Sequence, residues 1–385
     1  MKSIMTVLAC AALLAAQSGW ASDGFDDIFT QDEPGEAQVT GRIALDLRYF
    51  LDDGWDSAVD VSPGGFLNII ASSGDLEGTL ALGLEVDNDN PPIAMGDVVD
   101  ELYLKAFFPF GYLTAGLLKT EWGKGDGTHV IDPLNPLIQK NGVKTDLFEM
   151  KRAEAMVMAS VYLGENGLLE LVYKPYFHPL QSDLAGRWAT GMPDTPSPDT
   201  TTLTYSQGAA RITGTVGACD LGCLYYYGFM SEPGYEVSVV FTGTNLLDPT
   251  HYQTVISTVF TRAHLIGLEG AGALGPFTVR TELGYWLTED ADGDQPELYN
   301  HRFVYLGGID LLVPGTGIFA GVQLTGSYTL DFPQAPETDV DRLASYNGTA
   351  HANTLIGVIE LPFARDTMKI RLNGLYLFEA EGYML

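Results

Sequence analysis

Long apolar runs and basic side chains are both scarce in this chain of 385 residues. After residue 16, no stretch approaches the roughly 20 apolar residues that a membrane-crossing helix needs. Any residence in a membrane must therefore come from strands. Lysine and arginine number 20 against 50 aspartates and glutamates, and the formal charge of −30 argues against nucleic acid as a partner.

The first residues have the pattern of a secretory signal peptide. Lys2 supplies the basic start, an apolar run follows from Ile4 to Ala16, and small residues precede a cleavage point after about Ala21. Lipidation at Cys10 is the alternative, but the apolar run continues past that residue. We expect a signal peptide over 1–21, a periplasmic tail over 22–36 and one membrane domain over 37–385.

From residue 37 onward, apolar and polar side chains alternate. In residues 41–50, Ile43, Leu45 and Leu47 point one way, whereas Arg42 and Asp46 point the other. The segments 76–87 and 276–287 repeat this pattern. A soluble β-sandwich also alternates, but its strands average about 5 or 6 residues. Runs of ten or more are the length at which a tilted strand crosses a bilayer, so the sequence favours a transmembrane antiparallel β-barrel.

Short turns and long polar segments alternate along the chain, as they do in outer-membrane barrels with short periplasmic turns and long surface loops. The barrel has 14–18 strands on this interpretation, with a periplasmic N-terminus. The end Met384-Leu385 lacks a terminal aromatic residue, and a further strand is expected after it, so we expect a C-terminal truncation. The predicted strands are 40–50, 63–72, 76–87, 97–108, 110–120, 150–163, 167–177, 205–218, 221–242, 254–274, 275–290, 298–313, 315–330, 352–363 and 367–380, and Pro233 could divide the ninth.

The segment 111–136, GYLTAGLLKTEWGKGDGTHVIDPLNP, carries the most specific motif. A strand ends at a Trp-Gly pair, a glycine-rich loop with an aspartate follows, and an Asp-x-x-Asn-Pro sequence closes it. This arrangement resembles a group of uncharacterised porin-like outer-membrane β-barrels of bacteria. The resemblance implies a passive-transport role and identifies no substrate. The matching residues are Trp122, Gly123, Lys124, Gly125, Asp126, Asp132, Asn135 and Pro136.

Two sets of residues are candidates for a pore. A loop that folds into the lumen would bring charges to a constriction that selects ions. The alternative is an ordinary surface loop whose glycines and prolines fix its shape. The constriction candidates are Lys119, Trp122, Lys124, Asp126, His129, Asp132, Lys140 and Lys144. The alternation also places charges of both signs toward the lumen, namely Arg42, Asp46, Arg48, Glu77, Glu85, Glu101, Lys105, Arg280, Glu282 and Arg302.

Other chemistry has weaker support. Asp290, Asp292 and Asp294 have a calcium-like spacing without the later glutamate, so a solvated acidic loop is the default interpretation. Cys219 and Cys223 could form a disulfide across a turn or remain free thiols. For catalysis, His129 near Asp126 is the one worthwhile candidate. We expect no enzymatic activity, no metal site and no cofactor.

The sequence thus predicts a porin-like outer-membrane channel for passive diffusion of small hydrophilic solutes. Its partners would be outer-membrane lipid, small polar solutes and the barrel-assembly machinery, and a homo-oligomer is compatible with these features. Two alternatives stay open. One is a selective uptake or export barrel that is gated by the loop 119–152, and the other is a surface adhesin or structural barrel.

Overall fold

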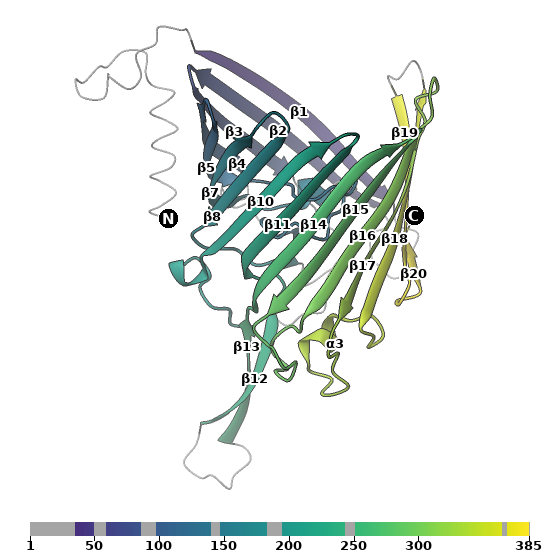
Figure 1. The fold of residues 1–385 in the computed structure, drawn as a ribbon. Coiled ribbons are helices and arrows are strands. Elements are labelled where there is room, and N and C mark those ends of the chain that lie inside the picture. Colours follow the sequence, from purple (N-terminus) through teal and green to yellow (C-terminus); the bar gives the residue numbers. More distant parts are fainter. Residues whose placement is uncertain are drawn as a thin grey trace, which may run out of the picture.

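The computed structural model describes residues 35–49, 59–85, 98–139, 147–182, 195–242, 251–363 and 368–384. Within these ranges, sixteen strands form one antiparallel sheet in which each strand pairs with its neighbours in chain order (Figure 1). Two short two-stranded sheets, β12-β13 and β6-β9, stand apart from it. The expected class, a large all-β antiparallel sheet, is therefore confirmed.

The strands of the main sheet are mostly long enough to cross a bilayer when tilted. Their bounds are β1 Glu36–Tyr49, β2 Val59–Ser73, β3 Leu76–Glu85, β4 Val99–Phe108, β5 Gly111–Leu118, β7 Glu154–Leu163, β8 Gly167–Lys174, β10 Gln207–Val216, β11 Cys219–Phe229, β14 Arg262–Leu274, β15 Phe277–Thr288, β16 Arg302–Leu312, β17 Phe319–Thr329, β18 His351–Phe363, β19 Met368–Leu377 and β20 Gly382–Met384.

Short turns join the strands at one edge of the sheet, and long segments join them at the other edge, except that the short turn 378–381 joins the last two strands at the second edge. Residues 109–110, 217–218 and 275–276 make two-residue turns at the first edge. At the second edge, residues 119–153 and 230–261 connect β5 to β7 and β11 to β14. We call these the short-turn edge and the long-loop edge. The predicted alternation of short and long connections is confirmed.

The alternation of side chains gives the sheet an apolar outer face and a polar inner face. On the paired strands β14 and β15, Leu268 and Leu283 lie opposite each other and are 56% and 53% exposed. The next pair, Glu269 and Glu282, points to the other face and is buried. Because a continuous apolar outer surface is unfavourable in water at about 25 cal/mol per Å², this face is suited to lipid.

Aromatic rings gather on the outer face near both edges. At the short-turn edge, Phe108 and Phe110 stack with their ring centroids 5.5 Å apart. Near the long-loop edge, Tyr285 and Phe303 lie 4.5 Å apart. Two such bands match the aromatic girdles that sit at the two interfaces of a bilayer.

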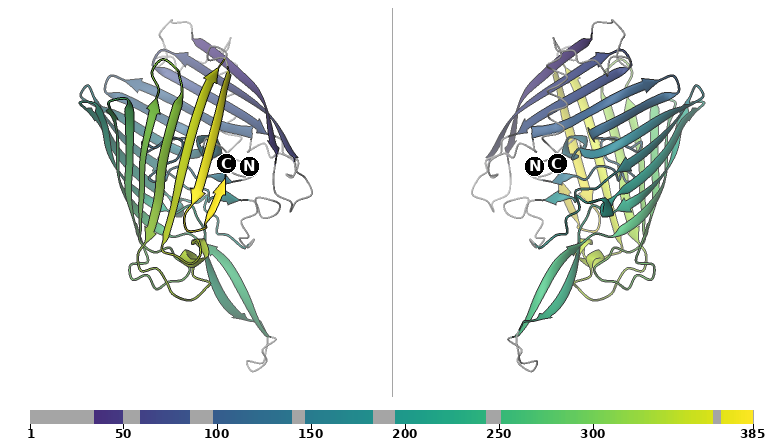
Figure 2. Two further views of the ribbon diagram at one scale, coloured as in Figure 1. Left: turned by 90° about the vertical axis from the view of Figure 1, so that its right-hand side faces the viewer. Right: turned by 90° about the vertical axis from the view of Figure 1, so that its left-hand side faces the viewer.

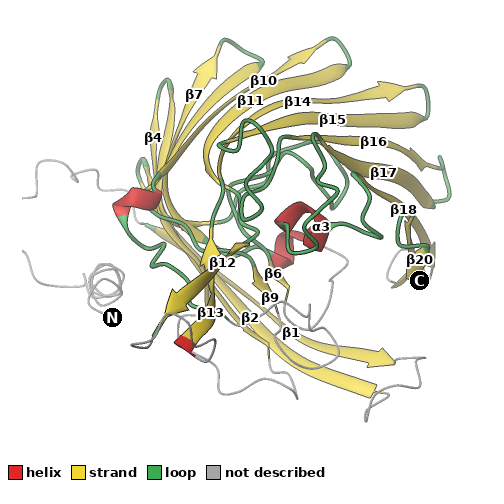
Figure 3. Ribbon diagram, turned by 90° about the horizontal axis from the view of Figure 1, so that it is seen from below, coloured by secondary structure: helices red, strands yellow, loops and turns green. Residues whose placement is uncertain are grey.

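The sheet wraps around the loops of the long-loop edge, which occupy its interior (Figure 3). Within the described residues, β1 has no partner at its free edge, and β20 pairs with β19 alone. The helical elements are short: η1 Leu147–Met150, η2 Leu203–Tyr205 and α3 Val340–Ala344. None of the helices in the described ranges is long and apolar enough to cross a membrane.

A separate hairpin accounts for most of the difference from the predicted strands. Strands β12 Gly234–Phe241 and β13 Tyr252–Val259 pair with each other and project beyond the long-loop edge (Figures 1 and 2). The predicted strands 221–242 and 254–274 were each too long, because each joins a strand of the main sheet to one of the hairpin. Pro233 marks the first division, as the sequence suggested. The three-residue β20 and the pair β6 Ile138–Gln139 and β9 Gln181–Ser182 were not predicted.

Candidate functional site

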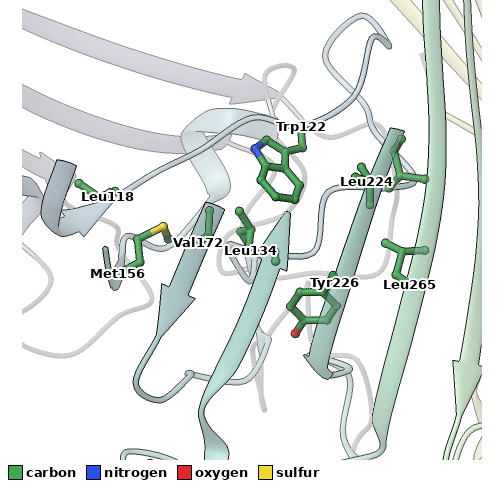
Figure 4. Packing of buried hydrophobic residues seen from close by; sticks show 10 residues of the cluster. Leu118, Trp122, Leu134, Met156, Val172, Leu224, Tyr226 and Leu265 are labelled. Carbon is green, nitrogen blue, oxygen red and sulfur yellow. The ribbon is translucent and has the colours of Figure 1, made fainter. Parts of the chain in front are cut away.

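The segment from residue 119 to residue 137, here called the inward loop, leaves β5 and packs against the inner face of the sheet. Trp122, Ile131 and Leu134 are 0–1% exposed. They contact side chains from β7, β8, β10, β11 and β14 (Figure 4), namely Met156, Val172, Ala209, Leu224, Tyr226 and Leu265. Each fully buried large side chain contributes roughly 1.5–3 kcal/mol. The largest apolar cluster of the described residues therefore lies inside the sheet and is built around this loop.

Asn135 ties the two ends of the inward loop together. Its amide nitrogen donates to the carbonyl oxygens of Leu118 and Arg152, at 2.9 and 2.8 Å. Its amide oxygen accepts from the backbone nitrogen and the hydroxyl of Thr120, at 2.8 and 3.0 Å. Every hydrogen-bonding position of this buried amide is thus used within the structure.

Two buried lysines donate hydrogen bonds to the backbone of the inward loop. Lys151 pairs with Asp132 and also donates to the carbonyl oxygen of Thr120 at 2.7 Å. Lys174, on β8, donates to the carbonyl oxygen of Leu134 at 2.6 Å and pairs with Glu154 at 3.3 Å. Both ammonium groups are almost fully buried, so each charge needs the partners it has.

Glu282 of β15 anchors the far side of the loop. One carboxylate oxygen accepts from the backbone nitrogens of Lys124 and Gly125, both at 2.7 Å, and contacts Nδ1 of His129 at 2.8 Å. The other oxygen accepts from the backbone nitrogen of Val130 at 2.8 Å. This carboxylate is fully buried. Three backbone N–H groups of the loop that have no strand or helix partner thus donate to this one carboxylate.

The inward loop needs glycine where its backbone lies very close to other atoms. Gly123 has a φ of +115°, and a Cβ there would lie 2.3 Å from Oε1 of Glu282 and 2.5 Å from Nδ1 of His129. A Cβ at Gly125 would lie 2.0 Å from the carbonyl oxygen of Thr128. A side chain at Gly123 would force the loop away from the wall, and one at Gly125 would clash with the loop's own backbone.

Two further side chains hold the tip of the loop. Gln323 of β17 accepts from the backbone nitrogen of Asp126 at 2.9 Å. Arg280 of β15 donates to the carbonyl oxygen of Lys124 at 3.1 Å and pairs with Asp310 of β16 at 3.3 Å. The inward loop therefore bridges from β5 to β15 and β17 across the interior, and it is bonded at both ends.

His129 lies between two carboxylates. Its Nδ1 faces Glu282 and its Nε2 faces Glu121, each at 2.8 Å. Burial opposes the charged imidazolium, but the hydrogen bond and the attraction to Glu282, together with the bond to Glu121, outweigh it and raise the pKa of His129. Both ring nitrogens are therefore occupied by carboxylates, which leaves neither for activating a nucleophile.

A cavity of about 990 Å³ opens beside the inward loop at the long-loop edge. Glu121, His129 and Asp132 line it on the loop's side, and the ends of the wall strands line the rest with residues such as Trp286 and Arg302. We call this space the vestibule. It is a mixed surface of carboxylates, aromatic rings and aliphatic side chains.

Comparisons with known proteins found similar solved structures but no family. No protein-family model and no curated protein matches the chain. Among solved structures, the outer membrane channel DcaP of Acinetobacter baumannii is 12% identical with a TM-score of 0.47, covering 91% of this chain and 92% of that one. OmpT, an outer membrane protein of Vibrio cholerae in its trimer form, is 10% identical with a TM-score of 0.49 and coverages of 91% and 94%. The anion-selective porin from Comamonas acidovorans is 10% identical with a TM-score of 0.48, covering 89% of each chain.

The predicted constriction residues have different surroundings in the structure. Trp122 packs against the wall, and Lys119 is buried in a pair with Asp100. Asp132 and His129 are buried and paired, whereas Asp126 is exposed and Lys124 is partly exposed. Lys140 and Lys144 lie outside the described residues. The structure thus brings the loop inward, as the constriction hypothesis requires, but buries several of its charges.

The predicted lumen-facing residues mostly share the inner face. Glu77 lies opposite Lys105 on the neighbouring strand. The ammonium group of Lys105 lies 4.1 Å from the centroid of the Tyr112 ring. Arg42 lies 4.5 Å from the centroid of the Phe66 ring and 3.4 Å from Glu149. By strand alternation Glu85, Glu101, Arg280, Glu282 and Arg302 point to the same face. The side chains of Asp46 and Arg48 lie outside the described set.

Of the two alternatives for the cysteines, the structure has free thiols and not a disulfide. Cys219 and Cys223 are free and exposed, and both lie in strand β11 rather than across a turn. Four residues of extended strand span roughly 13 Å, and a disulfide needs Cα atoms less than about 7 Å apart. The turn that the sequence suggested here lies earlier, at residues 217–218.

The acidic loop holds itself together through Asp290. Its buried carboxylate accepts from the backbone nitrogens of Gly293 and Gln295, each at 3.0 Å. Asp292 and Asp294 are exposed. Over the described ranges, no group of three His, Cys, Asp or Glu side chains could hold a metal ion. Asp290 therefore acts as a loop cap.

The sequence interpretation missed several residues that position the loop: Asn135 as a tie, Lys151, Lys174, Glu154, Gln323 and Arg211. On the inner face, Arg211 of β10 pairs with Glu269 of β14 at 2.7 Å and with Glu170 of β8 at 3.4 Å. Parity along each strand could have placed most of these side chains on the inner face. The contacts with the loop could not have been found that way, since they join residues far apart in the sequence.

Proposed function

We propose that this protein is a porin-like channel of the bacterial outer membrane, through which small hydrophilic solutes diffuse passively. The observation that carries the proposal is the inward loop, bonded to β15 and β17 by Glu282 and Gln323, inside a sheet whose outer face is apolar. Such a loop narrows the interior without filling it, because the vestibule remains beside it. A narrowed, polar, lipid-surrounded interior is what a diffusion pore requires.

The same contacts favour a fixed constriction over a gate. Loop closure and opening need a segment of low local stability. The inward loop has a buried apolar core, two buried lysine anchors and a carboxylate that accepts from three backbone nitrogens. In this proposal the loop keeps one position during transport, and residues 1–21 serve as the export signal. The lipid, the barrel-assembly machinery and further copies of the chain would be its partners.

Planar-bilayer recording tests the function. The purified protein, reconstituted at high dilution, should give stepwise conductance with a steady open level. A salt gradient should give a reversal potential of the sign for cation preference. If a protein that is shown to be folded and inserted by circular dichroism and protease resistance gives no current, the proposal fails.

A further inference from the structure

We propose that the vestibule is a binding site for small organic cations that combine an ammonium group with an apolar body. This inference rests on the channel function proposed above and names the class of solute that the channel would favour at its long-loop edge. Four features of the cavity carry it: its size, its charge, an acceptor without a donor, and its apolar lining.

The size of the vestibule suits a small solute. Its volume of about 990 Å³ lies at the upper end of the roughly 300–1,000 Å³ that small-molecule sites occupy. Its walls come from residues on the inward loop and from strand ends as distant in the chain as Phe229 and Thr325. The vestibule is therefore held on several sides by bonded structure, as a preorganised site must be.

The charge of the vestibule is negative. Glu121 is exposed, and in the described structure its hydrogen bond goes to Nε2 of His129. Glu232 is also exposed, and its contact is the hydroxyl of Ser231 at 3.4 Å. Within the described ranges, neither carboxylate has a lysine or arginine within ion-pairing distance.

The basic side chains that line the vestibule are already neutralised. Lys151 pairs with Asp132, and Arg302 pairs with Asp341 at 3.3 Å. A protonated His129 would sit between Glu121 and Glu282, so its single charge would face two carboxylates. Among the residues that the structure describes, an excess of negative charge therefore remains in either protonation state of this histidine, and it attracts cations.

Asp132 presents a buried acceptor that has no donor. Its side chain is 4% exposed and lines the vestibule. Lys151 contacts its Oδ2, whereas its Oδ1 has no hydrogen-bond partner. A buried acceptor without a donor costs about 1–3 kcal/mol. This oxygen is itself buried, so an ammonium group in the vestibule would stabilise it by charge attraction and not by a direct hydrogen bond.

The apolar part of the lining favours an organic cation over an inorganic one. Trp286 and Phe148 line the vestibule and are partly exposed, and Tyr346 is 41% exposed. Aromatic faces attract ammonium groups and also cover apolar surface. A hydrated metal ion would gain from the carboxylates but not from these rings.

Calorimetry with three matched probes tests the proposal. Benzylammonium, benzyl alcohol and benzoate share one ring and differ in charge. Titrated into the folded protein in detergent, benzylammonium should bind at least about tenfold more tightly than the other two. The variant E121Q/E232Q should weaken that binding about fivefold, because two partly hydrated ion pairs are lost. The variant D75N/E165Q removes the same charge from exposed positions at the short-turn edge and should leave the affinity unchanged.

Two results would overturn the inference. One is equal affinity for benzylammonium and benzyl alcohol. The other is an equal loss in the vestibule variant and the short-turn variant. Calorimetry does not require an open pore, so a protein that binds benzylammonium selectively but carries no current would refute the proposed function and leave the binding site standing.

Discussion

Replacing Glu282 by alanine should release the tip of the inward loop. The change removes the acceptor for the backbone nitrogens of Lys124, Gly125 and Val130 and one partner of His129. Each buried donor left unpaired costs about 1–3 kcal/mol, and water entering from the vestibule would keep the sum near the lower limit, about 3 kcal/mol. That loss corresponds to roughly a hundredfold rise in the local opening equilibrium.

Hydrogen exchange read by mass spectrometry measures this opening directly. A peptide covering residues 120–132 should exchange about a hundredfold faster in E282A, and the single-channel current should become noisier. D341A is the matched control, since Asp341 is also a buried carboxylate that accepts from a backbone nitrogen, that of Asn300, and it pairs with Arg302 instead of the loop. Unchanged exchange in E282A, or equal acceleration in D341A, would refute the view that Glu282 holds the inward loop in place.

Three further predictions follow from the same structure. Because the pKa of His129 is raised, the bonds of its charged ring to the two carboxylates stabilise the loop fully below pH 6.5, and this stabilisation is lost as the pH rises through the raised pKa. Hydrogen exchange of residues 120–132 should therefore quicken on the alkaline side. The variant H129Q should remove this pH dependence. Cys219 and Cys223 should both react with an alkylating reagent in the unfolded protein without prior reduction, and a mass showing fewer than two adducts would contradict their separation in β11. Leu283→Arg, on the outer face, should destabilise the folded protein by about 2–4 kcal/mol in lipid vesicles, whereas Thr278→Arg, on the inner face beside Asp310, should change it by less than about 1 kcal/mol; equal effects would mean that the two faces are wrongly assigned.

Most of the sheet was predictable because strand parity is a local property. The alternation from Phe277 to Thr288 places Leu283 outside and Glu282 inside without any knowledge of the neighbours. Connection lengths were equally readable from the sequence. The hairpin β12–β13 was missed as a separate unit because its residues continue the alternation of the strands before and after it. Periodicity reports that a segment is extended, and it does not report which sheet the segment joins.

The site was predictable only in part. The motif around Trp122 and Gly123 drew attention to the right loop, and the need for glycine there is now explained by the approach of Glu282. The burial of Trp122 and Lys119 was not predictable, since a charge or a ring in a polar loop gives no sign of which wall it will meet. Parity placed Glu282 inside, but its three backbone partners lie more than 150 positions earlier in the chain.

That separation in sequence has a consequence for the order of assembly. The loop's backbone donors are made long before the carboxylate that accepts from them, and this carboxylate is in place only once β15 has joined the sheet. Bringing together two segments that lie more than 150 residues apart in the chain is entropically costly, and it is slow compared with forming hairpins between neighbouring strands. The inward loop should therefore be among the last parts of the molecule to take shape, and a chain inserted without β15 would lack the bonds that hold the tip of this loop.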